Sequence, residues 1–191
     1  MHLNINYQPL NESEFIQALQ RAESAAYQRL LNETQDWVYN TVLGIVQNES
    51  AAEDLAQEVY IQVFRSIGKF RGDARLSTWM YRIAIQKALD WVRKQKRAQF
   101  WRNRGFGLHT NEETNFHHPG VQAEEKELAA VLFRAVKKLP EQQQIAWILI
   151  KTEGLPYSTV AEIMKTTVKS VEALMHRAKT NIKKNIQFHY K

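Results

Sequence analysis

No proline occurs between Pro9 and Pro119, a stretch of more than one hundred residues. Proline breaks helix interiors, so its absence permits long uninterrupted helices in this part of the chain. Apolar residues there recur at helical spacing, as in the series Ala52, Leu55, Val59, Val63 and Ile67. No segment alternates convincingly between apolar and polar residues with period two. The sequence therefore predicts an all-α fold.

Polar and glycine-bearing segments divide the predicted helices. The run Ser50–Glu53 has the pattern of a capping box and predicts that a helix starts there. The basic segment 68–73 predicts a loop, and a further long helix is expected over residues 76–97. Residues 101–122 are polar and lack periodicity, which is typical of a flexible linker. Helical periodicity resumes at Glu124.

This division predicts two small helical domains, residues 10–100 and 123–188, joined by the linker 101–122. In the second domain Pro140 marks the start of one helix and Pro156 the first turn of another, since proline is tolerated there. Residues 165–167 predict a turn, and a longer helix is expected from about Val168. This is the pattern of a helix-turn-helix, whose second helix enters a DNA major groove.

The net charge of +6 is strongly segregated along the chain. Residues 1–59 carry two basic and nine acidic side chains, whereas residues 60–104 carry twelve basic and two acidic ones. Residues 105–153 are mildly acidic, and residues 154–191 hold seven basic and two acidic side chains. Two basic blocks separated by an acidic one predict two contacts with a polyanion such as DNA. The alternative is a pair of solvated basic faces.

Composition excludes several classes of protein. No apolar run approaches the length of a membrane span, and the N-terminus lacks the pattern of a signal peptide, so we expect a cytoplasmic protein. The chain has no cysteine, which excludes disulfides and thiolate chemistry.

No catalytic constellation stands out, so we expect no enzyme, cofactor or small-molecule substrate. Acidic residues on the helix after Ser50, and the linker histidines His109, His117 and His118, could be imagined as metal ligands. Solvated side chains are the plainer interpretation.

Residues 69–97 interleave aromatic rings with arginines and lysines. Exposed rings beside cations suit an unstacked DNA strand, because bases stack on the rings while phosphates meet the charges. The alternative is a core helix in which tryptophans are buried and basic stems lie along the surface. For Trp79 and Trp91 we expect partial burial, whereas Phe70 and the basic loop favour a functional role.

Two long runs resemble a known family. AAEDLAQEVYIQVFRSIGKFRGDARLSTWMYRIAIQKALDWVRKQKR is similar to region 2 of extracytoplasmic-function sigma factors, and LPEQQQIAWILIKTEGLPYSTVAEIMKTTVKSVEALMHRAKTNIKK is similar to their region 4. The two motifs occur in the order and spacing of that family. The resemblance implies a subunit that carries RNA polymerase to promoters, reading the minus-ten element with one domain and the minus-thirty-five element with the other.

The resemblance also implies partners and site residues. Core RNA polymerase would dock through its beta-prime clamp on Asp54, Gln57 and Glu58, with the beta flap as a further contact. An anti-sigma factor, often a membrane protein, would hold the chain inactive. The expected minus-ten contacts are Lys69, Phe70, Arg71, Arg75, Trp79, Arg82, Gln86 and Arg93. The expected minus-thirty-five contacts are Tyr157, Lys169, Ser170, Glu172, Ala173, His176, Arg177 and Lys179.

Three departures from the family pattern bear on the exact promoter sequence and not on the class of protein. Gln86 stands where many relatives have asparagine, residues 158–159 replace an acidic pair, and residues 172–174 lack the usual basic and hydroxyl side chains. Two other functions remain as alternatives. A stand-alone helix-turn-helix regulator would explain residues 154–191 alone, and an adaptor without DNA contact would explain neither basic block.

Overall fold

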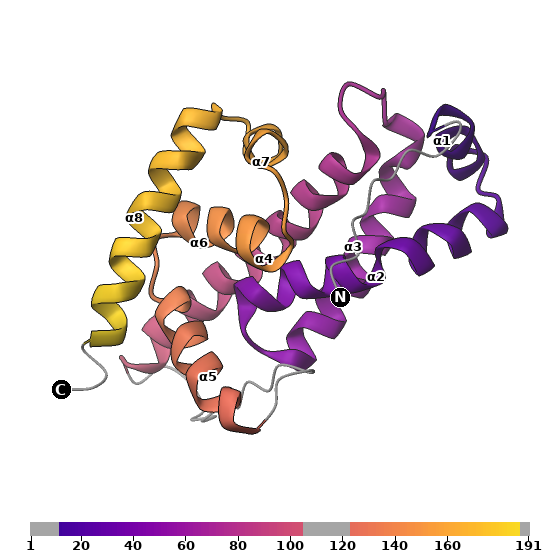
Figure 1. Ribbon diagram of the computed structural model, residues 1–191. Coiled ribbons are helices and arrows are strands. Elements are labelled where there is room, and N and C mark those ends of the chain that lie inside the picture. The colour runs from indigo at the N-terminus through magenta and orange to yellow at the C-terminus, as the bar shows by residue number, and fades with distance from the viewer. Residues whose placement is uncertain (1–11, 105–122, 188–191) are drawn as a thin grey trace.

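The computed structural model of the chain describes residues 12–104 and 123–187, with side chains from residue 129 onward in the second range. Every regular element in these residues is helical, and they fall into a first half, α1 to α4, and a second half, α5 to α8 (Figure 1). The predicted all-α class is thereby confirmed. The elements are α1 (Glu12–Gln20), α2 (Ser24–Val46), α3 (Glu49–Ser66), the 3-10 turn η1 (Ile67–Lys69), α4 (Leu76–Arg102), α5 (Ala123–Lys137), α6 (Glu141–Trp147), the π-helical turn η2 (Ile148–Thr152), α7 (Tyr157–Ile163) and α8 (Val168–Gln187).

The start of α3 differs from the predicted capping box. Asn48 is the N-cap, and its side-chain oxygen accepts a hydrogen bond from the backbone N–H of Ala51 at 2.8 Å. Gln47 ends α2 in the left-handed conformation with φ of 50°, so the chain has already turned before Ser50. Asparagine is as good an N-cap as serine, and the cap prediction at Ser50 was wrong by two residues.

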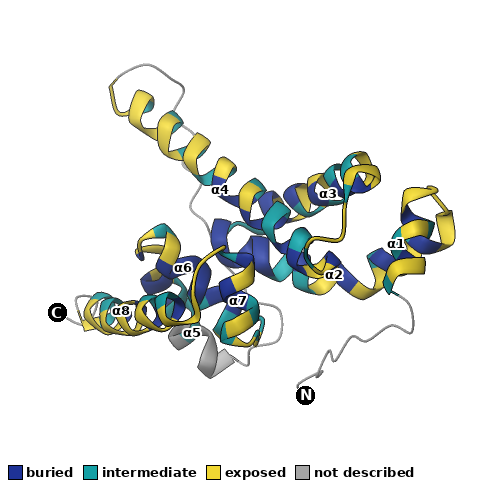
Figure 2. Ribbon diagram, turned by 90° about the horizontal axis from the view of Figure 1, so that it is seen from above, coloured by how far each residue is buried: buried dark blue, intermediate teal, exposed yellow. Residues whose placement is uncertain are grey.

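Helix α4 runs further than predicted, to Arg102 instead of Arg97. The added residues contain neither glycine nor proline, and the first glycine after the helix is Gly105. The C-terminal part of α4 projects from the body of the molecule and is largely exposed (Figure 2). Phe100 and Trp101 lie there with about half of their surface exposed. The predicted linker beyond residue 104 lies outside the described residues.

The helix-turn-helix is confirmed, and its turn has a clear physical basis. Lys165 adopts a left-handed φ of 51° directly after α7. Its N–H donates to the carbonyl of Glu162 at 3.1 Å, and the N–H of Thr166 donates to that of Ala161 at 2.9 Å. These two bonds form a Schellman motif, which satisfies the last carbonyls of the short helix. Thr167 then caps α8, since its hydroxyl accepts from the N–H of Ser170 at 3.1 Å.

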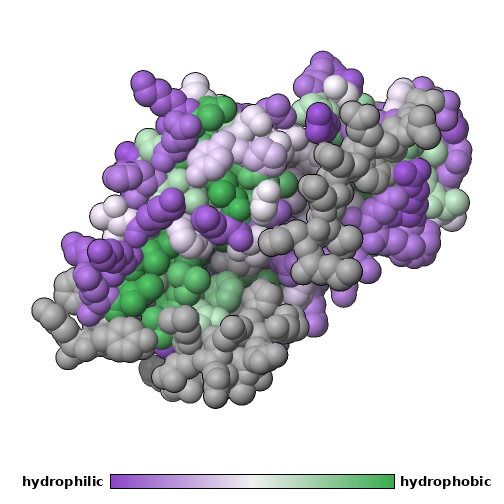
Figure 3. All heavy atoms as spheres, viewed as in Figure 1, coloured by the Kyte–Doolittle hydropathy of each residue, from purple (hydrophilic) through white to green (hydrophobic). Residues whose placement is uncertain are grey.

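The second half has a small core of its own where α5, α6 and α8 meet. Figure 3 shows apolar surface over this region, whereas the visible surface over α1 and the N-terminal part of α2, at the right of this view, is mostly hydrophilic. Among the residues that the structure describes, no helix is both long and apolar enough to cross a membrane. The buried members of this core are Ala135, Val136, Leu139, Ala178 and Ile182.

The larger core is continuous between the two halves. Apolar side chains of η2 and α7 pack against α2 and α4 in one cluster. A side chain at Gly44 would bring its Cβ within 3.2 Å of Ile148, so glycine lets η2 approach α2 closely. The buried Gln144 donates to the carbonyls of Gly44 and Ile45 at 3.4 and 3.3 Å. Gln47 donates to the carbonyl of Phe133 at 2.8 Å. Apolar packing and buried polar bonds together join the halves.

A buried carboxyl lies at this contact. Burial raises the pKa of Glu153 to about 8, and its Oε1 atom is buried without a hydrogen-bond partner. Burial raises the pKa of the Tyr81 phenol on α4, and the negative charge of Glu153 raises it further. Tyr81 in turn stacks on Trp37 of α2 at 4.1 Å between ring centroids. Packing of the halves therefore favours the protonated form of Glu153.

The substitution Glu153→Gln tests this burial through the pH dependence of stability. Between the ordinary pKa of 4.5 and about 8, the unfolded chain releases a proton that the folded chain keeps. The free energy of unfolding should therefore fall as the pH rises through this window. Glutamine cannot ionise, so the difference between variant and parent should be small at pH 5 and should favour the variant at pH 8. Urea unfolding at several pH values measures this, with the exposed Glu162→Gln as control, and an equal effect of both substitutions would contradict it.

Candidate nucleic-acid interface

Several predicted minus-ten residues form one stripe along α4. Arg75 is the N-cap residue, and Trp79, Arg82, Gln86 and Arg93 follow at intervals of three, four or seven residues. Residues at these intervals share one face of a helix. All of them are at least partly exposed. The structure therefore brings together the helical part of the predicted minus-ten set.

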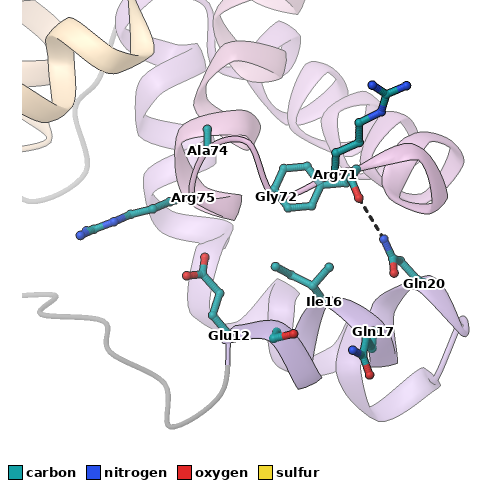
Figure 4. Close-up of a pocket in the computed structure, with 10 residues that line it drawn as sticks. Glu12, Ile16, Gln17, Gln20, Arg71, Gly72, Ala74 and Arg75 are labelled. Atoms are coloured by element: carbon teal, nitrogen blue, oxygen red, sulfur yellow. Dashed lines mark hydrogen bonds between the residues drawn. The ribbon is translucent and has the colours of Figure 1, made fainter.

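The loop before α4 borders a hollow of about 430 Å³. Figure 4 shows its walls, which are α1 on one side and residues 70–75 on the other. The predicted residues Phe70, Arg71 and Arg75 line it together with Ile16 and the polar side chains of α1. The ring of Phe70 and the aliphatic side chain of Ile16 offer stacking for a single base. Figure 4 shows the guanidinium groups of Arg71 and Arg75 pointing outward from the hollow, where they can meet adjacent phosphates. Lys69 is exposed at the end of η1.

Phe70 and Trp79 pack against each other. Their ring centroids lie 5.0 Å apart with the rings tilted by 42°. Both side chains are partly buried, as is Trp91. The expected partial burial of the two tryptophans is confirmed. Trp79 therefore supports the loop from α4, and Phe70 carries the ring that faces the hollow.

The second half of the molecule engages two arginines of the α4 stripe. Arg82 donates from Nη2 to the carbonyl of Glu162 at 2.7 Å and from Nε to that of Ile163 at 3.2 Å. Arg93 forms an ion pair with Glu141 of α6, with Nη2 and Oε1 2.9 Å apart. The C-terminal end of α7 carries partial negative charge, which a guanidinium complements. Part of the predicted minus-ten face is thus occupied by protein acceptors in this structure.

Gln86 is exposed, and its amide nitrogen donates to both carboxylate oxygens of Asp90 at 2.9 and 3.0 Å. It does not belong to the residues that line the hollow beside the loop. A base captured by Gln86 would have to displace Asp90 and would lie on the α4 stripe. The role of Gln86 in reading a base stays a prediction.

The predicted docking residues lie on α3. Asp54, Gln57 and Glu58 are exposed on one side of the helix, opposite its buried apolar stripe. Glu58 pairs with Lys87 of α4, with the charged atoms 2.8 Å apart. Ile61 and Phe64 on the same helix expose at least half of their surface. The surface combines acidic and amide groups with nearby apolar side chains, which suits a protein partner.

The outer face of α8 holds most of the predicted minus-thirty-five residues. Val171 and Met175 are buried on its inner face. Tyr157 and Ser170 are partly buried. The fully exposed members of the predicted set are Lys169, Glu172, Ala173, His176, Arg177 and Lys179. The helix thus presents a mainly basic, solvent-facing surface of the kind that enters a major groove.

Two groups of polar residues that the structure uses leave no mark in the sequence. Glu12 and Gln20 of α1 bond to the loop before α4. Gln144 and the carboxyl of Glu153 lie between the two halves. No short motif marks such residues, because their partners are distant in the chain. Among the described residues no group of three or more histidine or acidic side chains could hold a metal ion, and the linker histidines lie outside them.

Two family models match the chain. The model described as Sigma-70 region 2 matches residues 30–98. The model described as Sigma-70, region 4 matches residues 130–182. The first range holds α3, the loop and most of α4, and the second holds the helix-turn-helix. The matches thus cover both candidate DNA-binding surfaces and the α3 face.

Curated relatives match over nearly their whole length. The RNA polymerase sigma-H factor of Pseudomonas aeruginosa is 28% identical over 187 residues, covering 92% of this chain and 94% of the relative. The ECF RNA polymerase sigma-E factor of Haemophilus influenzae is 29% identical over 186 residues, which cover 93% of this chain and 96% of the relative. The protein of the same name from Escherichia coli is 28% identical over 187 residues, covering 93% and 95%.

Two solved structures share the fold. CnrH in complex with the cytosolic domain of CnrY superposes with a TM-score of 0.66 at 16% identity, over 91% of this chain and 96% of that one. The sigma factor RpoE in complex with the anti-sigma factor NepR from Bartonella quintana gives a TM-score of 0.65 at 17% identity. The superposition covers 84% of this chain and 96% of that one. At these identities the likeness concerns the fold alone.

A matched pair of substitutions tests the contacts of the α4 stripe. Arg82→Lys should lower the free energy of unfolding by about 1 kcal/mol, because an ammonium cannot reproduce the forked donation to two carbonyls. Arg93→Lys should change it by less than about 0.5 kcal/mol, because exposed ion pairs contribute little. Arg93 and Glu141 are 50% and 38% exposed. Urea unfolding measures both, and equal effects would show that Arg82 does not hold α7.

Proposed function

The chain belongs to the extracytoplasmic-function sigma factors of the sigma-70 family, and from this premise we propose how its surfaces divide the work of initiation. As a sigma factor it directs promoter-specific transcription initiation through regions 2 and 4. The observation that carries the proposal is the pair of separate basic surfaces, one in each matched region. The family is not enzymatic, so these surfaces serve binding.

Region 2 reads the minus-ten element in this proposal. The hollow beside residues 70–75 accepts one unstacked base, and the α4 stripe follows the strand that carries it. Extruding a base costs a few kcal/mol, which stacking and contacts to the base edge must offset. Phe70 supplies the ring, and Arg71 and Arg75 supply the charges for adjacent phosphates. Region 4 reads the minus-thirty-five element as duplex DNA through the outer face of α8.

Core RNA polymerase binds the exposed face of α3 in this proposal, through its beta-prime clamp, with the beta flap as a further contact to region 4. Residues 10–100, 101–122 and 123–188 are the proposed domain 2, linker and domain 4. An anti-sigma factor is a further proposed partner, since the solved RpoE structure of the same fold is a complex with the anti-sigma factor NepR. The proposed location is the cytoplasm, where core polymerase and promoter DNA are found.

A stand-alone helix-turn-helix regulator is the competing function, and reconstituted transcription separates the two. A sigma factor added to core polymerase should give transcripts from defined start sites on a genomic promoter library, and neither component should do so alone. A regulator should bind duplex operators tightly without polymerase and should give no initiation with core enzyme. The second result would reject the proposed function.

Charge reversal at Glu58 tests the docking face. Glu58→Lys combined with Gln57→Ala should weaken binding to core polymerase about tenfold, which corresponds to about 1.4 kcal/mol. Lys87→Ala breaks the same intramolecular ion pair without reversing charge, and Asp36→Lys reverses an exposed charge on α2. Both controls should bind core polymerase as the parent does, in a fluorescence anisotropy assay. Equal affinity of the double variant and the parent would remove these residues from the docking face.

Arg177→Ala tests the reading face of α8. Its loss should reduce initiation from promoters that depend on the minus-thirty-five element, while promoters that lack this element should be unaffected. A lost phosphate contact lowers the salt slope by about one, whereas a lost contact to a base edge costs about 1–3 kcal/mol and relaxes one position. Lys138→Ala removes an exposed positive charge outside α8 and serves as control. Initiation unchanged at every salt concentration would exclude Arg177 from the interface.

A further inference from the structure

Helix α1 holds both ends of the loop that borders the hollow. At one end Gln20 donates from its side-chain amide to the carbonyls of Ile67 at 3.2 Å and Phe70 at 3.1 Å. At the other end the carboxylate oxygen Oε1 of Glu12 accepts from the backbone N–H of Leu76 at 3.1 Å. Figure 4 shows both side chains reaching from α1 toward the loop. These bonds join segments about fifty to sixty residues apart in the chain.

The Glu12 bond satisfies a helix start that lacks a side-chain cap of its own, whereas the Gln20 bonds reinforce the end of η1, where the carbonyl of Ile67 also accepts from the N–H of Phe70. The N-cap residue of α4 is Arg75, whose side chain forms no capping hydrogen bond. Glu12 caps α4 from another helix, and its negative charge suits the positive end of the α4 dipole. Gln20 binds carbonyls at the end of η1, where the next residues leave helical geometry. The two bonds therefore define where the loop leaves η1 and where it enters α4.

The middle of the loop has little to hold it. Arg71, Gly72 and Asp73 are exposed. Gly72 has φ of +78°, and a Cβ added there would meet no atom within 4 Å. A short segment whose centre packs against nothing close takes its conformation from its ends. The distance between α1 and the loop, and with it the shape of the hollow, depends on the two anchors.

We propose that Glu12 and Gln20 are positioning residues of the minus-ten reader, which hold the loop at the spacing from α1 that one base requires. This inference rests on the proposed function of region 2. Neither side chain needs to touch DNA for the effect. Helix α1 lies before residue 30, where the region 2 match begins, so the inference extends the reader to a helix outside that match.

Isosteric substitutions separate hydrogen bonding from charge and bulk. Gln20→Glu keeps the shape of the side chain but replaces a donor with a carboxylate that faces two carbonyl oxygens. Glu12→Gln keeps an acceptor oxygen for Leu76, whereas Glu12→Ala removes it. Each lost anchor should lower initiation about five-fold to tenfold on promoters that need a defined minus-ten element, since one hydrogen bond contributes about 1 kcal/mol. Glu12→Gln should stay close to the parent.

Glu14→Ala is the matched control, because Glu14 lies in the same first turn of α1, carries the same charge and is exposed. A purely structural effect of a substitution lowers the amount of active protein and scales initiation equally on every promoter. A displaced loop instead changes which bases are preferred. The base-preference profile is therefore the readout that a structural role alone would not alter.

The test uses the full chain with core polymerase on promoters randomised across the minus-ten element, and core affinity is measured for every variant. We expect Glu12→Ala and Gln20→Glu to flatten the preference at one or two minus-ten positions with core affinity preserved. Glu12→Gln and Glu14→Ala should retain the parental profile. Parental profiles in Glu12→Ala and Gln20→Glu, or equal changes in Glu14→Ala, would overturn the inference and leave the proposed function standing. The absence of any minus-ten preference in the parent would instead overturn the proposed function and the inference with it.

Discussion

The packing of η2 and α7 against α2 and α4 is the contact on which the rest of the structure depends. It joins the apolar side chains of both halves into one core, with Gly44 providing the space for Ile148. Apolar burial supplies the main driving force for such a contact. Polar groups specify its geometry, because the buried Gln144 and the partly exposed Arg82 each donate to backbone carbonyls in the other half. Both candidate DNA-binding surfaces take their relative position from this contact.

The relative position of the two candidate DNA-binding surfaces limits how the chain can bind a promoter. Arg82 contacts the carbonyl of Ile163, and α8 begins at Val168, only five positions further along the chain. Five residues span at most about 18 Å. The minus-ten and minus-thirty-five elements lie about 25 base pairs apart, which is about 85 Å at 3.4 Å per base pair. One chain in this arrangement cannot engage both elements, so we infer that the halves separate when promoter DNA is bound.

Separation would also release side chains that the minus-ten face needs. Arg82 and Arg93 lose their protein acceptors when α6 and α7 move away. Glu153 would enter water, where its carboxylate is stable, so the buried state is the one that a rise in pH disfavours. The chain thus has two ways to satisfy its α4 arginines, one within the protein and one with a polyanion. Under the proposed function, the contact of the halves and the binding of DNA would draw on the same two side chains, Arg82 and Arg93.

Local features of the sequence predicted much of this fold. The two prolines at 140 and 156 each stand one residue before a helix, where proline is tolerated. The apolar periodicity correctly gave the buried side of α3, and the turn at residues 165–167 correctly gave the start of α8. The cap at Asn48 was missed, because Ser50–Glu53 has the full capping-box pattern, whereas the third residue after Asn48 is Ala51. Contacts between distant segments could not be predicted, since nothing in the spacing of Glu12 and Leu76 shows that they bond.

The distance between the halves, free and on a promoter, tests this account most directly. The chain contains no cysteine, so Gln35→Cys on α2 and Lys183→Cys on α8, both at exposed positions, would carry a pair of spin labels uniquely. The account predicts one short distance distribution for the free chain and a much longer one in the complex with core polymerase and promoter DNA. The same short distance in both states, in a complex that initiates transcription, would contradict it.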